Sequence, residues 1–207
     1  MLSSQGFDLW ADGYDQCVLS SDEEHAYPFA GYREVLNTIY GKIRASTGKT
    51  VLDLGFGTGV LCHRLDQDGY EIFGLDFSPK MLEQASRKMP RAHLLLHDFS
   101  TGLPEIWRNK TFDHIVCTYA IHHLTDWQKI SLIAQLADSL SPGGLLQIGD
   151  IAFATQAQLE QCRTRFADIW DEDELYPVFE ALQPAFPALR FHPVSFCAGI
   201  LTLPARL

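Results

Sequence analysis

Short apolar runs alternate with amphipathic segments from about Lys49 to Ala152, and this alternation constrains the fold more than any other feature. Buried parallel strands are continuous apolar runs, whereas helices repeat apolar residues about every three or four positions. Strands are predicted at residues 50–54, 70–75, 92–97, 114–119 and 145–152. Because segments of helical length separate these strands, the sequence predicts an α/β fold with a doubly wound, mostly parallel sheet.

Capping residues mark where the helices between these strands begin. A helix is predicted over residues 59–68, between a glycine-rich turn and a glycine that can end it. Ser78 is a suitable N-cap, and Pro79 would then take the first helical position, which proline favours. Thr125 can cap the amphipathic helix that leads to the fifth strand.

The charge balance argues against partners that carry many negative charges. The 207 residues include 26 acidic and 16 basic ones, for a formal net charge of −10. Nucleic acids and anionic membranes attract Lys and Arg, so neither partner is expected. The sequence shows no secretory signal, and no apolar run approaches the ~20 residues that span a bilayer. We therefore expect a cytoplasmic protein.

The sequence also predicts no metal site. Its five cysteines have no metal-binding spacing and are interpreted as reduced, mostly buried thiols. They are Cys17, Cys62, Cys117, Cys162 and Cys197. The acidic runs at residues 22–24 and 171–174 contain neither His nor Cys, so we interpret them as solvated surface charge.

A glycine-rich turn between the first strand and the first core helix is the most informative segment. It reads Asp53-Leu54-Gly55-Phe56-Gly57-Thr58-Gly59. Alternate glycines let the backbone approach a ligand closely. The pyrophosphate-binding pattern G-x-G-x-x-G would require a glycine where this chain has Val60. The carboxylate of Asp53 would repel a pyrophosphate but attract an ammonium group.

This turn resembles the first motif of class I S-adenosylmethionine-dependent methyltransferases, and later segments resemble further motifs of that family in the same order. They are residues 74–76, 97–99, 112–120, the His-His-Leu at 122–124, and the Pro-Gly-Gly at 142–144. The resemblance covers residues 49–150 well and the C-terminal part weakly. It implies a Rossmann-like fold.

The resemblance also implies S-adenosylmethionine as cofactor. Asp53 is expected to bind its amino group, Asp76 the ribose hydroxyls and Asp98 the adenine amine. The cofactor-binding residues expected on this basis are Asp53, Gly55, Gly57, Gly59, Asp76, Phe77, Asp98, Phe99 and Thr118.

The resemblance implies methyl transfer by in-line displacement, and the small, acidic chain favours a small-molecule acceptor. The protein is expected to be a monomer or a homodimer. Two alternatives stay open: a catalytically silent S-adenosylmethionine-binding module and an NAD-dependent oxidoreductase. Asp53 and Val60 disfavour the second alternative.

Two residues are candidates for the catalytic step. His122 could act as a general base or a substrate anchor, because a neutral imidazole accepts a proton near neutral pH. A packing role fits His122 equally well, since many methyl acceptors need no base. Tyr14 could stack near the sulfonium, because an aromatic face attracts a cation.

The chain is expected to form a single methyltransferase domain in three parts. Residues 1–47 form an N-terminal helical cap, residues 48–152 the cofactor-binding core, and residues 153–207 lid helices and a C-terminal hairpin. In the last part, one helix is predicted after Thr155 and a second through Leu175 and Leu182. The antiparallel edge hairpin over residues 190–203 is expected to break at Gly199.

Overall fold

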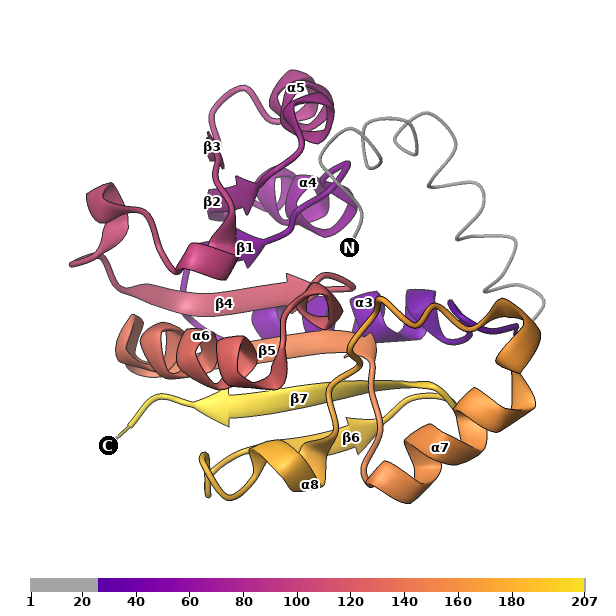
Figure 1. Cartoon of the computed structure of the whole chain (residues 1–207). Helices are drawn as coiled ribbons and strands as arrows, with labels where there is room; N and C mark the ends of the chain where they lie inside the picture. The colour runs from indigo at the N-terminus through magenta and orange to yellow at the C-terminus, as the bar shows by residue number, and fades with distance from the viewer. Residues whose placement is uncertain (1–25, 207) are drawn as a thin grey trace.

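One mixed sheet, in the order β3-β2-β1-β4-β5-β7-β6, organises the computed structural model, which describes residues 26–206 (Figure 1). The strands are β1 (Thr50–Leu54), β2 (Glu71–Asp76), β3 (His93–Leu96), β4 (Phe112–Thr118), β5 (Leu140–Ile151), β6 (Arg190–Pro193) and β7 (Ala198–Pro204). The first five pair in parallel, and β7 pairs antiparallel with both β5 and β6. This arrangement confirms the predicted doubly wound α/β sheet with an antiparallel edge.

Helices connect the strands largely where the capping residues predict them. The α-helices are α3 (Tyr32–Arg44), α4 (Val60–Gln67), α5 (Pro79–Lys88), α6 (Asp126–Asp138), α7 (Gln156–Arg165) and α8 (Phe179–Leu182). Short 3-10 helices are η1 (Phe99–Thr101), η2 (Glu105–Trp107), η3 (Ile121–His123) and η4 (Ala167–Ile169). The Ser78 hydroxyl accepts the Met81 N–H at the start of α5, and Thr125 forms a capping box with Gln128 at the start of α6.

The two faces of the sheet bury separate apolar clusters. Val35 and Ile39 of α3 pack on one face, and Leu132 and Leu136 of α6 pack on the other. Figure 1 shows these two helices on either side of the central strands. Because both faces are covered, the central strands are mainly apolar, and Asp76 and Thr118 stand at the ends of β2 and β4.

The predicted helix through residues 175–182 is wrong except for its last turn, which is α8. The Leu175 N–H donates to the His122 carbonyl at 2.8 Å, and the Phe153 N–H donates to the Pro177 carbonyl at 3.1 Å. Val178 forms a parallel bridge with Phe153. These long-range backbone hydrogen bonds hold the segment extended beside the end of β5, although its apolar spacing is helical.

The predicted break at Gly199 is also wrong. Gly199 lies inside β7, opposite Asp150 of β5 and Pro193 of β6, and the hairpin turns at residues 194–197 instead. A Cβ atom at Gly199 would lie 2.4 Å from ring atoms of Phe191. Glycine is present because the Phe191 ring occupies that space. The Pro142-Gly143-Gly144 motif lies within β5, which begins at Leu140 and shifts register against β4.

Several sequence-based expectations concern residues outside 26–206, namely the first part of the N-terminal cap with Tyr14, the acidic run at 22–24, and Cys17. In the part of the chain that the structure describes, the four cysteines are free and buried. Within the same part, no helix has the length and apolar character needed to cross a membrane.

The contact between α3 and β5 provides a test of the fold. A side chain at Gly149 would place its Cβ 2.4 Å from Val35 Cγ1, whereas a Cβ at exposed Gly41 meets nothing within 4 Å. We expect Gly149→Leu to lower the free energy of unfolding by about 1–3 kcal/mol through overpacking. Gly41→Ala should raise it by about 0.5–1 kcal/mol, since alanine favours a helix. Urea denaturation measures both changes. The same change in the free energy of unfolding for Gly149→Leu and Gly41→Ala would contradict the described packing of α3 on β5.

Candidate functional site

The turn between β1 and α4 contains three glycines with left-handed backbones. Their φ angles are +71° at Gly55, +54° at Gly57 and +80° at Gly59. A Cβ at Gly55 would lie 2.5 Å from Ala120 Cβ, and one at Gly59 would lie 2.9 Å from Met89 Cε. A Cβ at Gly57 would meet nothing within 4 Å. Two glycines therefore permit close packing, whereas Gly57 leaves space open above the turn.

Hydrogen bonds connect this turn to the end of β2. The Gly55 N–H donates to the Leu75 carbonyl at 2.7 Å, and the Gly57 N–H donates to Asp76 Oδ2 at 2.8 Å. The other oxygen of Asp76 accepts the Ser78 N–H at 2.9 Å. These bonds place the buried Asp76 carboxylate beside the glycine turn.

A pocket opens at this carboxyl edge of the sheet, where doubly wound folds bind ligands. Its lining residues are Tyr32, Leu36, Asp53, Gly55, Phe56, Gly57, Thr58, Val60, Leu61, Asp76, Phe77, Met81, Phe99, Thr118, Tyr119, Ala120 and His123. Seven of the nine expected cofactor-binding residues are in this set. Gly59 is the N-cap of α4 and Asp98 is exposed, and neither lines the pocket.

Asp98 has a local role instead. Its Oδ1 accepts the Ser100 N–H at 2.9 Å and so caps η1. The next residue, Phe99, is buried and reaches the pocket. The carboxylate at the end of β3 therefore holds the turn that positions Phe99.

Asp53 carries the most distinctive polar group of the pocket. One of its oxygens accepts the Cys62 thiol at 2.9 Å, and the other, Oδ1, is buried without a hydrogen-bond partner among the described residues. Burial, together with the nearby Asp76 carboxylate, raises the pKa of Asp53 to about 7. A cationic group at Oδ1 would satisfy this oxygen and favour the ionised form.

The sequence predicted an N-terminal helical cap but did not identify Tyr32 and Leu36 as pocket residues. Tyr32 and Leu36 line the pocket, and the Tyr32 ring lies 4.9 Å from the Tyr119 ring. Tyr119 directly follows β4 and has a φ of +50°, which is unusual for a residue with a side chain. The apolar stripe of α3 indicates that the helix packs, but it does not say which edge of the sheet α3 covers.

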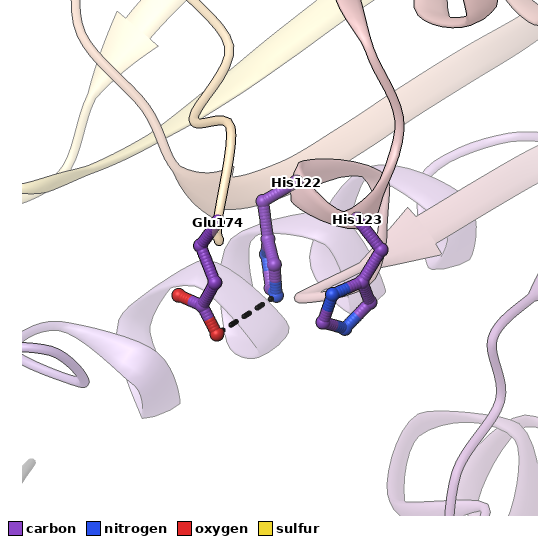
Figure 2. Close-up of side chains that lie close together, drawn as sticks. All are labelled: His122, His123 and Glu174. Carbon is purple, nitrogen blue, oxygen red and sulfur yellow. Dashed lines mark ion pairs between the residues drawn. The ribbon is translucent and has the colours of Figure 1, made fainter. Parts of the chain in front are cut away.

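A cluster of His122, His123 and Glu174 lies next to the pocket (Figure 2). The His122 Nδ1 atom is 2.7 Å from Asp150 Oδ1, and its Nε2 atom is 3.6 Å from Glu174 Oε1. His123 lines the pocket, whereas His122, the predicted catalytic residue, does not. The second predicted catalytic residue, Tyr14, lies outside the described residues.

The two neighbouring histidines differ in their protonation. Burial alone would lower the pKa of His122, but the carboxylates of Asp150 and Glu174 outweigh burial and raise that pKa above its usual value. Burial and the adjacent His122 lower the pKa of His123 to about 3. The His123 ring is therefore neutral at physiological pH.

Glu174 belongs to a hydrogen-bond network that includes Tyr176 and Tyr27. The Tyr176 hydroxyl donates to Glu174 Oε2 at 2.5 Å and is 2.6 Å from the Tyr27 hydroxyl. The Tyr27 ring stacks on Trp170 and Phe166 with centroids 5.5 Å and 5.1 Å apart. The acidic run at 171–174 is thus not wholly surface charge, because Glu174 faces two histidines.

Comparisons with known proteins identify the family. A family model described as a methyltransferase domain matches residues 51–144. An uncharacterized methyltransferase of Geobacillus kaustophilus is 36% identical over 188 residues, which cover 87% of this chain and 84% of that protein. An uncharacterized methyltransferase of Bacillus subtilis is 35% identical over 193 residues, covering 89% and 87% of the two chains.

Solved structures share the fold at lower identity. Magnesium protoporphyrin IX methyltransferase from Synechocystis with bound SAH has a TM-score of 0.69 and 18% identity, with 86% of this chain and 85% of that chain covered. The N-methyltransferase NodS from Bradyrhizobium japonicum has a TM-score of 0.64 and 16% identity, with coverage of 86% and 89%. The chain belongs to the class I S-adenosylmethionine-dependent methyltransferases, an assignment that its relatives, its Rossmann-like sheet and its glycine turn all support.

Proposed function

We propose that this methyltransferase transfers a methyl group to a small-molecule acceptor and that the pocket over the glycine turn holds S-adenosylmethionine. The observation that carries the proposal is the buried, unpartnered Asp53 Oδ1 in a pocket that Gly57 leaves open. An unsatisfied buried carboxylate oxygen costs free energy, so a matching ammonium group would stabilise it.

The residues present fit the cofactor. Asp53 would accept the amino group, Asp76 the ribose hydroxyls, and the rings of Phe77 and Phe99 would flank the adenine. Asp98 is exposed, so its predicted bond to the adenine amine would require its side chain to turn toward the pocket.

Methyl transfer requires the protein mainly to position the methyl donor and the acceptor. When bound, S-adenosylmethionine supplies a methyl group activated by a positively charged sulfur. Thr118, Tyr119 and His123 line the pocket beyond the glycine turn and would hold the acceptor in line with the methyl group. Aromatic side chains on α3 and at the end of β4 would exclude water from the reaction.

The acceptor side is aromatic and acidic. Tyr27, Trp170 and Tyr176 surround Glu174 beside the histidines. Such a lining suits a small molecule better than a nucleic acid backbone, as does the net charge of −10. The extended segment at 170–178 would cover the acceptor, which retains the predicted lid role without the predicted helix.

Binding of S-adenosylhomocysteine, the reaction product, tests the cofactor pocket. Gly57→Val would project a side chain into the open space and should lower the affinity at least tenfold. Gly143→Val is the matched control, because Gly143 also has a positive φ, +78°, and open space around it, but lies in β5 away from the pocket. Both variants should lose about 1–2 kcal/mol of stability from the left-handed backbone.

Calorimetric titration measures these affinities, with NAD titrated in parallel. Equal affinity of Gly57→Val and the unaltered chain for S-adenosylhomocysteine would contradict the proposed pocket. Tight binding of NAD alone would favour the oxidoreductase alternative.

Asp53 predicts a pH dependence of the same affinity. Its carboxyl group has a pKa of about 7 in the free protein, and the ligand's ammonium group favours the ionised form. Below about pH 7, binding must displace a proton, so affinity should fall about tenfold for each pH unit. In Asp53→Asn the affinity should be lower and nearly independent of pH between about 5.5 and 8. An unchanged pH profile in this variant would exclude Asp53 as the ammonium ligand.

Transfer of labelled methyl groups into a metabolite extract tests the acceptor class. We expect label in low-molecular-mass products, and none with Gly57→Val. Label in protein or RNA alone would overturn the small-molecule assignment. Saturable S-adenosylhomocysteine binding with no transfer to any acceptor would favour the catalytically silent module.

A further inference from the structure

We propose that His122, His123 and Glu174 form a binding site for a divalent transition-metal ion of the zinc class beside the methyl-donor pocket. Figure 2 shows the three side chains converging from η3 and from the segment before Tyr176. Each offers one ligand atom, and these atoms all lie within 4.8 Å of one another. The sequence predicted no metal site, because the acidic run at 171–174 contains no histidine.

The distance between the Nε2 atom of His122 and the Oε1 atom of Glu174 fits two ligands of one metal ion better than it fits a hydrogen bond. The His122 Nε2 and Glu174 Oε1 atoms are 3.6 Å apart, too far for a good hydrogen bond. Two ligands held about 2.1 Å from a tetrahedral zinc ion lie about 3.4 Å from each other. The three ligand atoms lie within 4.8 Å of one another, so the His123 and Glu174 side chains would rotate to bring all three within bonding distance of one ion.

Neighbouring groups orient these ligands as in known metal sites. Metal-binding histidines usually donate their second ring N–H to a carboxylate. The His122 Nδ1 atom is 2.7 Å from Asp150 Oδ1, which leaves Nε2 directed toward the cluster. The backbone N–H groups of Ile121 and Ile151 fix the Asp150 carboxylate at 3.1 Å and 2.8 Å. Similarly, the Tyr176 hydroxyl holds Glu174 Oε2 and leaves Oε1 for the ion.

The donor set indicates the class of ion. Two imidazoles and one carboxylate favour zinc and similar transition metals over magnesium or calcium, which prefer oxygen ligands. Three protein ligands leave one coordination position open, as catalytic zinc sites do. His123 borders the donor pocket, and Glu174 borders a second hollow lined by Trp170 and Tyr176. The open coordination position would therefore lie between the donor pocket and this second hollow.

The use of this position rests on the proposed function. A hydroxyl or thiol acceptor bound there would lose its proton to solvent more readily, because the ion lowers its pKa. The acceptor's electron pair would form the new bond to the methyl carbon. The bond from that carbon to the sulfonium would break, and its electrons would stay on the departing sulfur.

Titration of the full, metal-stripped chain with Zn²⁺ and Co²⁺ tests the site directly. We expect saturable binding of one ion per chain, with the visible absorption of tetrahedral Co²⁺. Glu174→Gln and His123→Ala should each weaken Zn²⁺ binding at least about tenfold. Glu172→Gln, a matched control in the same acidic run, should not, because Glu172 pairs with Arg163 at the surface.

Weak, unsaturable binding, or equal affinity in Glu174→Gln and Glu172→Gln, would overturn the proposal. Circular dichroism checks that each variant folds. Should a variant fail this check, the Co²⁺ spectrum of the unaltered chain decides, since an octahedral spectrum would exclude the site. S-adenosylhomocysteine binding is measured separately, so loss of the metal site is distinguished from failure of the cofactor pocket.

Discussion

The hydrogen bond from the Gly57 N–H to the Asp76 carboxylate joins the turn after β1 to the end of β2, and the ligand pocket depends on it. Parallel strands bring their carboxyl ends to one edge of the sheet, but the loops that follow could still diverge. This charge-assisted, partly buried bond holds the two loops together. The Gly55 N–H also donates to the Leu75 carbonyl, so two hydrogen bonds hold the glycine turn to this edge, where Asp53 and Asp76 line the same pocket.

A second set of backbone hydrogen bonds builds the other half of the site. The segment after α7 joins η3 through the Leu175 N–H and joins the end of β5 through Phe153. This attachment places Glu174 and Tyr176 against the two histidines. Under the proposed function, the methyl donor would lie in the pocket at the edge of the parallel core, and this C-terminal segment would border the acceptor. Such a division would let acceptor specificity vary while the cofactor pocket stays the same.

Local signals predicted the parts of the fold whose causes are local. The first five strands, the Ser78 and Thr125 caps and the glycine turn follow from apolar runs and capping chemistry within a few residues. The expectations that failed concern distant partners. Gly199 is not a break, since the Phe191 ring needs its space, and residues 175–178 are not helical, since their backbone bonds lie on η3 and β5.

By itself, the sequence determined the α/β class, the five strands of the parallel core and the glycine turn with Asp53 and Asp76, because periodicity, capping and backbone freedom act over short distances. Only the tertiary structure decided that α3 lines the pocket and that Glu174 meets His122 and His123. It also decided that Asp53 keeps one buried oxygen without a partner. The physical reason is that burial and contact between distant segments depend on how helices and loops pack around the sheet, and no residue pattern within one segment encodes that packing.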